Sequence, residues 1–599
     1  MLVGTLVRFL GFSAWSLSND ELSAFYRIWE SDLGETIQKG VRPDGHPAGV
    51  QVFLYFWTQF FGTSEFALRF PFVLFGCFSI FLVYLISKKW FGNTAALLSS
   101  AAWAVLYEPV LYSQIARPYS SGVFFVLLFT YFWQQLVFES DITRPPRKFR
   151  IFLLALSSSL ALYNHYFSGF TVILLWGIGL FFLNRFNRMQ YFLSGLISLL
   201  LFLPHLEISI AQFSKGGVGI WLGPPKWDFL FHYLFTNTFN SWHFPLVALS
   251  ILGAGILMGS QGRDAFKYKS ICLIIFTVVY LVGHLYSVYV NPVLQSSVLL
   301  FCFPFLVMGF FSFTKNLSIK LAIGGSFLML GSGLAGLYID KKFALEKPFA
   351  SFREPVQTAL RWKMENPGLK TEIFFNAISR AYLEYYTSRQ NNYPDFSFSR
   401  GDDADFGKHF AAFVDQSDAD QIIYGWTNIR HPISAFEIIF SRGYELKSSV
   451  TWYNAAIYRF EKSKNTDPET NLPDSSNTRL TFSRDTEFFN QIEFSGDSPD
   501  LKGDKNLLFI ARLDSLSGGG IHLVKEVHEN DSLISWESAY SPHYGVKESG
   551  TLSLLVRRKG ESLSGKKIKV YFWNPEKQSG QISRFKQIPI TTDENIFFD

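Results

Sequence analysis

Residues 62–91 read GTSEFALRFPFVLFGCFSIFLVYLISKKWF: a polar start, an apolar run from 66 to 87, then Lys88 and Lys89. A helix needs roughly 17–25 mostly apolar residues to cross a membrane, and this run has that length. A short opening segment at 2–15 carries Arg8, and we interpret it as a membrane helix that lacks its cytoplasmic end. The sequence therefore predicts about eleven transmembrane helices, the others lying near 94–113, 119–138, 149–165, 167–183, 191–210, 244–260, 271–290, 293–313 and 318–338.

Charge divides the chain into two parts. Residues 1–339 hold 13 acidic and 21 basic residues, whereas residues 340–599 hold 36 and 33. The first part is predicted to be a membrane domain and the second to be water-soluble. The three cysteines, Cys77, Cys272 and Cys302, all lie in apolar runs, so the soluble part has neither a disulfide nor a cysteine zinc site. The basic residues form no stripe, which argues against a nucleic-acid partner.

The short loops give the orientation. Positive residues gather in cytoplasmic loops, and every second loop here is basic. We therefore predict a multi-pass protein of the plasma or inner membrane, with a cytoplasmic N-terminus and with residues 340–599 outside. The opposite short loops hold only Arg117, Lys215 and Lys226, whereas the basic loops hold Lys88 and Lys89; Arg144, Arg147, Lys148 and Arg150; Arg185 and Arg188; Arg263, Lys267 and Lys269; and Lys315 and Lys320.

The soluble part is predicted to contain two domains. Residues 340–465 alternate helix and strand patterns, which indicates a small α/β domain, and they lack the Gly-rich loop of a nucleotide site. A polar linker at 462–477 leads to residues 478–599, whose short apolar runs between turns indicate a β-sandwich. Its Trp536, Tyr540, Tyr544 and Trp573 either stack on sugars or fill the core. The expected α/β elements are helices at 356–364, 377–389 and 433–442, strands at 371–375 and 421–424, and a hairpin at 446–460.

Charged side chains collect in the outer loops beside the apolar runs. Asp20 and Glu21 follow the first segment, and Asp44 and His46 share a turn. Such groups are costly beside a bilayer unless they are paired or used, so these loops are the default functional site. Arg69 lies one helical turn after Glu65, and we expect the two to pair.

Several short motifs, taken in order, resemble the integral-membrane GT-C glycosyltransferases, in particular the protein O-mannosyltransferase and lipid A aminoarabinose transferase group. The resemblance covers roughly residues 8–310. It implies an enzyme that takes a sugar from a polyprenyl phosphate and passes it to a protein, lipid or glycan on the outer face. The motifs are Asp20-Glu21; His46-Pro47; Gly62-x-x-Glu65-x-x-x-Arg69-x-Pro71; Lys88-Lys89-Trp90-Phe91-Gly92; Ser113-Gln114-Ile115-Ala116-Arg117-Pro118-Tyr119; and Tyr163-Asn164-His165-Tyr166-Phe167.

The reaction chemistry points to the same residues. A polyprenyl phosphate leaves as a stable anion, so one carboxylate base and a cation suffice, and direct displacement inverts the anomeric centre. We predict Asp20 as the base, Glu21 as its supporting partner and Arg117 as the phosphate ligand. The resemblance implies that His46 also lies near the donor. The residues predicted to position substrates are Asp44, Glu108, His165 and Tyr119, although Glu108 is equally interpretable as a solvated helix end.

Two alternatives remain open. Asp44, His46 and His165 could meet in a divalent-metal site, although their spacing is not typical of ligands, and the sequence points to no other cofactor. The membrane part could instead belong to a transporter or to a catalytically silent scaffold that presents glycan-binding outer domains. A transporter normally places charges in mid-membrane and shows repeats, whereas here the charges lie in the outer loops.

Overall fold

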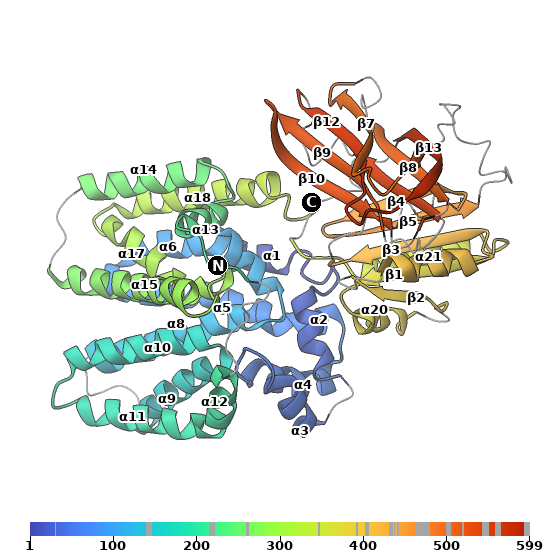
Figure 1. The fold of residues 1–599 in the computed structure, drawn as a ribbon. Coiled ribbons are helices and arrows are strands. Elements are labelled where there is room, and N and C mark those ends of the chain that lie inside the picture. Colours follow the sequence, from blue (N-terminus) through green and yellow to red (C-terminus); the bar gives the residue numbers. More distant parts are fainter. Residues whose placement is uncertain are drawn as a thin grey trace. The chain divides into compact units, whose positions relative to one another are not determined.

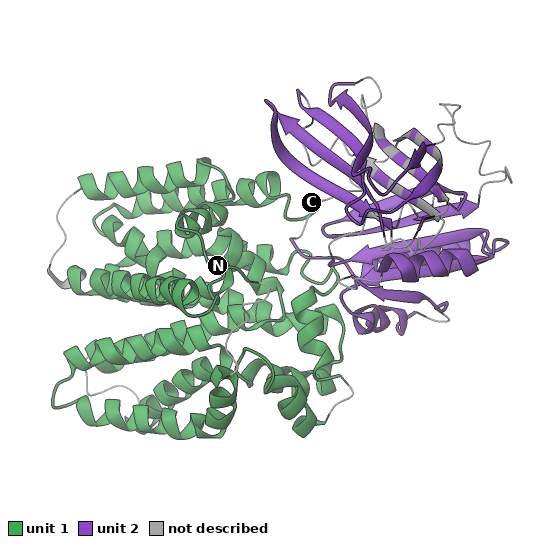
Figure 2. Ribbon diagram, in the orientation of Figure 1, with its two compact units in different colours: residues 1–347 green, residues 348–599 purple. Residues whose placement is uncertain are grey.

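The computed structural model describes residues 1–29, 32–138, 147–214, 222–258, 263–345, 348–390, 393–401, 406–429, 435, 438–439, 442–462, 480–498, 505–514, 516–517, 520–541, 550–556, 563 and 565–591. The chain forms two compact units, residues 1–347 and residues 348–599 (Figure 2). Helices build the described part of the first unit, and the second unit contains the sheets (Figure 1).

The helices of the first unit follow one another with short connections. They are α1 (Leu2–Phe9), α2 (Asn19–Tyr26), α3 (Leu33–Glu35), η1 (Thr36–Val41), α4 (Gly49–Phe61), α5 (Glu65–Phe91), α6 (Asn93–Val105), α7 (Tyr107–Leu111), η2 (Tyr112–Gln114), α8 (Pro118–Phe138), α9 (Arg147–Asn164), α10 (Tyr166–Gly179), η3 (Leu180–Phe182), α11 (Arg188–Phe202), η4 (Leu203–His205), α12 (Leu206–Ser214), α13 (Phe229–Asn237), α14 (His243–Leu257), α15 (Arg263–Tyr289), α16 (Ser296–Leu299), α17 (Phe303–Phe311), η5 (Ser312–Thr314), α18 (Ile319–Ala335) and η6 (Gly336–Asp340).

Helix α5 has clear start and stop signals at its two ends. The Ser64 hydroxyl accepts a hydrogen bond from the Ala67 N–H and caps the first turn, where Glu65 complements the helix dipole. The last turn carries Lys88 and Lys89, and Gly92 ends the helix with a φ of 91°, a conformation that favours glycine. The polar residues that flank the apolar run therefore fix the ends of the helix.

The described residues contain five helices that are long and apolar enough to cross a membrane, or six if the bent pair α6 and α7 to η2 is one span. The five are Glu65–Phe91, Pro118–Phe138, Arg188–Ser214, Phe266–Tyr289 and Ile319–Asp340. Three further apolar helices are shorter, at Tyr166–Phe182, His243–Leu257 and Phe303–Thr314. The prediction of a polytopic helical membrane domain is confirmed, whereas the number eleven stays a prediction.

The break between α6 and α7 explains the arginine in the opening segment. The two helices meet at a 64° bend, where Leu106 is extended, so the last carbonyls of α6 lack helical partners. Arg8 on α1 is fully buried and donates to the Ala104 carbonyl at 2.7 Å and to the Trp103 carbonyl at 3.2 Å. Arg8 therefore caps the C-terminal end of α6, where a positive charge is favourable.

The second unit contains a five-stranded mixed sheet in the order β2-β1-β3-β5-β4. β1 pairs in parallel with β2 and β3, whereas β5 is antiparallel to β3 and β4. One core of this domain forms where Phe410 and Val414 of a helix pack with strand residues such as Phe374, Ile422 and Tyr424. The elements are α19 (Arg353–Glu365), β1 (Thr371–Ala377), α20 (Arg380–Thr387), β2 (Ser397–Arg400), α21 (Phe406–Gln416), β3 (Gln421–Thr427), β4 (Tyr444–Trp452) and β5 (Ala455–Lys462).

Two four-stranded antiparallel sheets follow, with the strand orders β10-β9-β12-β7 and β11-β8-β13-β6. Residues from both sheets, among them Leu523, Phe572, Phe509 and Leu552, form one buried core, which is the arrangement of a β-sandwich. Trp536 lies on the surface of this sandwich, 46% exposed. The strands are β6 (Leu480–Phe482), β7 (Phe488–Ser495), β8 (Lys505–Asp514), β9 (His522–Glu529), β10 (Ser532–Tyr540), β11 (Gly550–Val556), β12 (Lys567–Trp573) and β13 (Gly580–Thr591).

The predicted order of a helical region followed by sheet-containing α/β and all-β parts is confirmed. Three sequence predictions lie wholly or largely outside the described residues: the helix at 433–442, the linker and Tyr544. Arg144 of a basic loop lies outside them as well.

Candidate active site

The site is built around the start of α2, where the side chains of Asp20 and Glu21 enter different surroundings. Ser18 and Glu21 form a reciprocal cap: the Glu21 N–H donates to the Ser18 hydroxyl at 3.3 Å, and the Ser18 N–H donates to the Glu21 carboxylate at 2.9 Å. This capping box buries Glu21, which is only 2% exposed, and leaves Asp20 on the exposed side of the helix. The local sequence Ser18-Asn-Asp-Glu21 thus assigns the two carboxylates to different surroundings.

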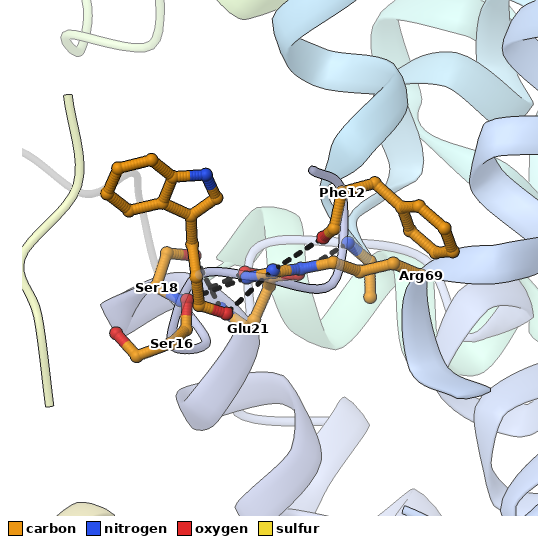
Figure 3. Close-up of polar contacts among 7 residues, drawn as sticks. Phe12, Ser16, Ser18, Glu21 and Arg69 are labelled. Carbon is orange, nitrogen blue, oxygen red and sulfur yellow. Dashed lines mark hydrogen bonds and ion pairs between the residues drawn. The ribbon is translucent and has the colours of Figure 1, made fainter. Parts of the chain in front are cut away.

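Arg69 of α5 meets Glu21 in a two-pronged ion pair, with its Nε 2.8 Å from Oε1 and its Nη2 2.7 Å from Oε2 (Figure 3). The expected pairing of Arg69 with Glu65 is wrong, because this side chain points to the loop between α1 and α2. Its five N–H groups are all used, since the remaining three donate to the carbonyls of Phe12, Trp15 and Ser16.

Glu21 also reaches the segment before α8. Its Oε1 accepts the Ala116 N–H at 2.8 Å, so the backbone next to Arg117 is fixed to the start of α2. Burial by itself would raise the pKa of Glu21, but the charge and hydrogen bonds of Arg69 and the two backbone N–H groups outweigh it and lower the pKa. We call this set of Ser18, Glu21, Arg69 and the Ala116 N–H the Glu21 clamp.

Arg117 lies at the centre of a second group of charges. Its side chain is 7% exposed, and its Nε is buried without a hydrogen-bond partner among the residues that the structure describes. Burial favours the neutral form, but Tyr119, Asp20, Asp44 and Glu21 together raise the pKa of Arg117. Arg117 therefore stays charged and has a donor free for an anion.

The turn at 41–48 brings an acid and an imidazole to the same place. Asp44 forms an ion pair with Arg27, and its carboxylate lies 3.4 Å from Nδ1 of His46. Burial would raise the pKa of Asp44, but the hydrogen bond and charge of His46, together with the charges of Arg27 and Arg117, hold it well below its usual range. Asp44 is therefore ionised throughout the physiological range.

His165 completes the group from the N-terminal end of α10. Its ring centroid is 5.2 Å from that of His46 and 6.3 Å from that of Tyr119. Within the described parts of the chain, no three His, Cys, Asp or Glu side chains are arranged to hold a metal ion. We call this set of Asp20, Asp44, His46, Arg117, Tyr119 and His165 the Arg117 cluster.

Asp20, which belongs to this cluster, and Glu108, which does not, differ in their exposure. Among the described residues, no hydrogen bond or ion pair ends on the Asp20 carboxylate, which is exposed beside Arg117. Glu108 is 3% exposed, so its interpretation as a solvated helix end is wrong. Its N–H donates to the Asn237 side chain at 3.3 Å, and its carboxyl lies near Tyr112, whose ring centroid is 4.7 Å from that of Tyr119 in the cluster.

Sequence reasoning missed Arg27, the C-cap residue of α2, which forms the ion pair with Asp44. It also missed the residues that hold the turn at 41–48 from the side of α12, His205 and Gln212. A single amide at the end of a long apolar run is the one signal that could have indicated Gln212.

Residues 45–208 match the sequence model of the dolichyl-phosphate-mannose-protein mannosyltransferase family. The resemblance is confirmed. The matched region carries His46, Arg69, Arg117 and His165, and it begins after Asp20 and Glu21.

The chain is similar to three kinds of solved structure. ArnT from Cupriavidus metallidurans in the apo state is 10% identical, with 76% of this chain and 96% of that chain covered and a TM-score of 0.47. The Archaeoglobus fulgidus oligosaccharyltransferase in the apo form is 12% identical, with 66% and 60% covered and a TM-score of 0.40. Arabinofuranosyltransferase AftD from Mycobacteria is 10% identical, with 100% and 59% covered and a TM-score of 0.41. The comparison with curated proteins gives no match.

Proposed function

We propose that this protein transfers a sugar from a polyprenyl-phosphate donor to an acceptor on the outer face of the membrane, with inversion at the anomeric carbon. The observation that carries the proposal is Arg117, a buried cation whose Nε has no hydrogen-bond partner among the described residues. Arg117 lies directly before the membrane helix α8 and beside the exposed Asp20. A lipid phosphate at this point would place its sugar within reach of the carboxylate. Two of the similar structures contain a bound polyprenyl phosphate: ArnT bound to undecaprenyl phosphate and AglB in complex with dolichol-phosphate.

Asp20 and Arg117 divide the chemistry between them. Arg117 stabilises the charge that develops on the leaving phosphate, and Asp20 accepts the proton from the acceptor hydroxyl or phosphate as it attacks. Because the phosphate leaves without protonation, the site needs no second carboxyl to act as an acid. Glu21 supports both residues, since its clamp fixes the backbone next to each of them.

The other predicted residues position the substrates. Asp44 and His46 meet Arg117 from the turn at 41–48, and Tyr119 and His165 face them from the starts of α8 and α10. Glu108 is proposed to act on the acceptor side, through Tyr112 and Tyr119. The donor sugar is a hexose or a pentose, and the acceptor is a protein, lipid or glycan. Residues outside this group select the sugar and the acceptor.

The orientation is part of the proposal, because the donor sugar has to face outwards. A reporter that is active only outside the cytoplasm should give a signal when fused after residue 345 and none when fused after residue 145. The reverse result would place the Arg117 cluster on the cytoplasmic side and would contradict the outward reaction.

Polyprenyl phosphate itself gives the direct test, since every donor of this class releases it whatever the sugar. The purified protein in detergent should bind undecaprenyl or dolichyl phosphate, and Arg117→Ala should bind it more weakly. A wild-type protein that binds neither lipid phosphate would contradict the proposal. Mass spectrometry of surface glycans, lipids and glycoproteins from a deletion strain would then identify the acceptor by what loses its sugar.

A further inference from the structure

The turn at 41–48 carries Asp44 and His46. It is held by hydrogen bonds from α12, a helix that lies far from it in the sequence. Gln212 of α12 is 6% exposed, and its amide Nε2 donates to the Val41 carbonyl at 2.8 Å and to the His46 carbonyl at 2.9 Å. One side chain thus joins the two ends of the turn. Both protons of the amide nitrogen are used, since an amide has two donors.

A second contact fixes the residues that follow His46. The Ala48 N–H donates to Nε2 of His205 at 2.9 Å, and the other ring nitrogen, Nδ1, lies 2.8 Å from the Ser209 hydroxyl. Because Nε2 accepts, His205 is neutral with its proton on Nδ1. Pro47 lies between these contacts and has no backbone N–H that could donate a hydrogen bond. The backbone on both sides of His46 is therefore held by the segment from η4 to α12.

Tyr166 connects the same amide to the other imidazole of the Arg117 cluster. Its hydroxyl donates to Oε1 of Gln212 and lies 3.3 Å from the Ser209 hydroxyl, and Tyr166 directly follows His165. This hydrogen bond orients the amide, so that the oxygen faces Tyr166 and the nitrogen faces the turn. Gln212 thus connects the elements that carry His46 and His165.

We propose that Gln212 is a positioning residue, and that with His205 and Tyr166 it forms a latch through which α12 sets the placement of Asp44 and His46 for the lipid-phosphate donor. The inference rests on the proposed function. The latch acts by keeping the turn in its binding-competent arrangement, and the apparent affinity for the donor falls as the populated fraction of that arrangement falls.

The chain supplies a matched control for the latch. Arg42 in the same turn forms an ion pair with Glu207 on α12, with Nη2 3.0 Å from Oε1, but these side chains are 41% and 78% exposed. This pair joins the same two elements in water, where an ion pair contributes little. Gln212→Leu and Glu207→Gln therefore compare a buried and an exposed link between one turn and one helix.

The experiment measures binding of undecaprenyl phosphate, together with hydrogen exchange of the peptides that cover residues 41–48, in the full chain in detergent. Gln212→Leu should weaken binding roughly tenfold, as expected for two lost buried hydrogen bonds, and should speed exchange in this turn. Glu207→Gln should change binding less than about twofold. In a transfer assay the donor KM should rise for Gln212→Leu while kcat at saturating donor stays close to that of the wild type.

Tyr166→Phe keeps the proposal testable if Gln212→Leu does not fold. It removes only the hydroxyl that orients the amide, and its matched control is Tyr163→Phe, whose hydroxyl donates to the Leu201 carbonyl at 3.0 Å instead. Tyr166→Phe should weaken lipid-phosphate binding in the same direction but less, and Tyr163→Phe should not weaken it.

The outcomes separate the latch from the proposed function. If Gln212→Leu binds the lipid phosphate as tightly as the wild type, and its residues 41–48 exchange at the wild-type rate, the latch is overturned and the proposed function stands. A wild-type protein without lipid-phosphate binding would overturn the function, and faster exchange at 41–48 in Gln212→Leu would then support the structural link alone. Equal losses in Gln212→Leu and Glu207→Gln would also overturn the assignment to Gln212.

Discussion

The Glu21 clamp and the Arg117 cluster are joined through neighbouring residues of the chain, yet they differ in how far their polar groups are satisfied. In the clamp, Arg69 uses all five of its N–H groups and Glu21 accepts from two backbone N–H groups as well. In the cluster, Asp20 is exposed, and the Nε of Arg117 is buried without a partner within the described chain. A satisfied buried network maintains the structure, whereas unsatisfied groups are available for a substrate.

The difference also separates two adjacent carboxylates of nearly the same chemistry. The capping box takes Glu21 because its third position in the helix lets the side chain reach back to Ser18. Asp20, one residue earlier, points about 100° away around the helix axis. Position in the first turn of α2, rather than acidity, therefore decides which carboxylate supports the fold and which can accept a proton.

The largest expected effect is that of Asp20→Asn on turnover. Asparagine keeps the shape but accepts no proton, so sugar transfer should fall by a factor on the order of 10²–10⁴. The melting temperature should stay within a few degrees of that of the wild type, because Asp20 is exposed. Steady-state transfer and thermal unfolding measure the two quantities. An Asn variant with full turnover would remove Asp20 from the mechanism.

Glu21→Gln should act mainly on stability. It leaves the Arg69 guanidinium buried without its counter-ion, a change that typically costs about 3–5 kcal/mol. The free energy of unfolding should fall accordingly, and activity should return at low temperature, where the variant stays folded. Arg42→Gln, which breaks an exposed pair, is the matched control. If Glu21→Gln and Arg42→Gln destabilise equally, the clamp is not the structural element described above.

Arg117→Ala should weaken lipid-phosphate binding by about 1.5–3 kcal/mol, the contribution of a hydrogen bond to a charged group. Arg117→Lys should restore only part of this, because an ammonium lacks the flat fork of the guanidinium. Binding isotherms of polyprenyl phosphate for the wild type, Arg117→Ala and Arg117→Lys measure these differences in affinity. Unchanged affinity in Arg117→Ala would place the phosphate elsewhere.

The smallest expected effect is a difference in acid sensitivity. The pKa of Glu21 is lowered in the folded protein, so below its ordinary value of 4.5 the unfolded state binds more protons than the folded state. The stability that Glu21 contributes is present above that pH and is lost as the pH falls through the folded pKa. Melting temperatures measured from pH 6 down to about pH 3 should therefore fall more steeply for the wild type than for Glu21→Gln. Parallel curves would contradict the lowered pKa.

The sequence predicted those helices and strands that show a clear apolar or alternating pattern. Lengths of apolar runs predicted both ends of α8 and the start of α5 to within one residue, whereas α5 continues four residues beyond its predicted end. Alternating patterns predicted α19, β1, β3 and the β4–β5 hairpin. Strand β2 and helix α21 were missed, since four residues are too short for a period to show and the helix begins beside a run of aspartates. The cluster residues were predicted from their places in the loops that the charge pattern assigns to the outer side.

The partners of these residues could not be predicted in the same way. Arg69 was expected to pair with Glu65 because residues four apart face each other on a helix, but Glu21 lies 48 positions away and offers two oxygens and a buried setting. The latch of Gln212 and His205 spans 157 to 171 positions. Such contacts depend on how the helices pack, which no local pattern encodes.

The ratio of turnover in Asp20→Asn to turnover in Glu21→Gln tests the central claim most directly, when both are measured at a temperature where both proteins are folded and bind the lipid phosphate. We predict that Asp20→Asn is slower by at least about tenfold, because it alone lacks the proton acceptor. A Glu21→Gln protein that is the slower of the two under these conditions would contradict the account and would make the buried carboxylate the reacting group.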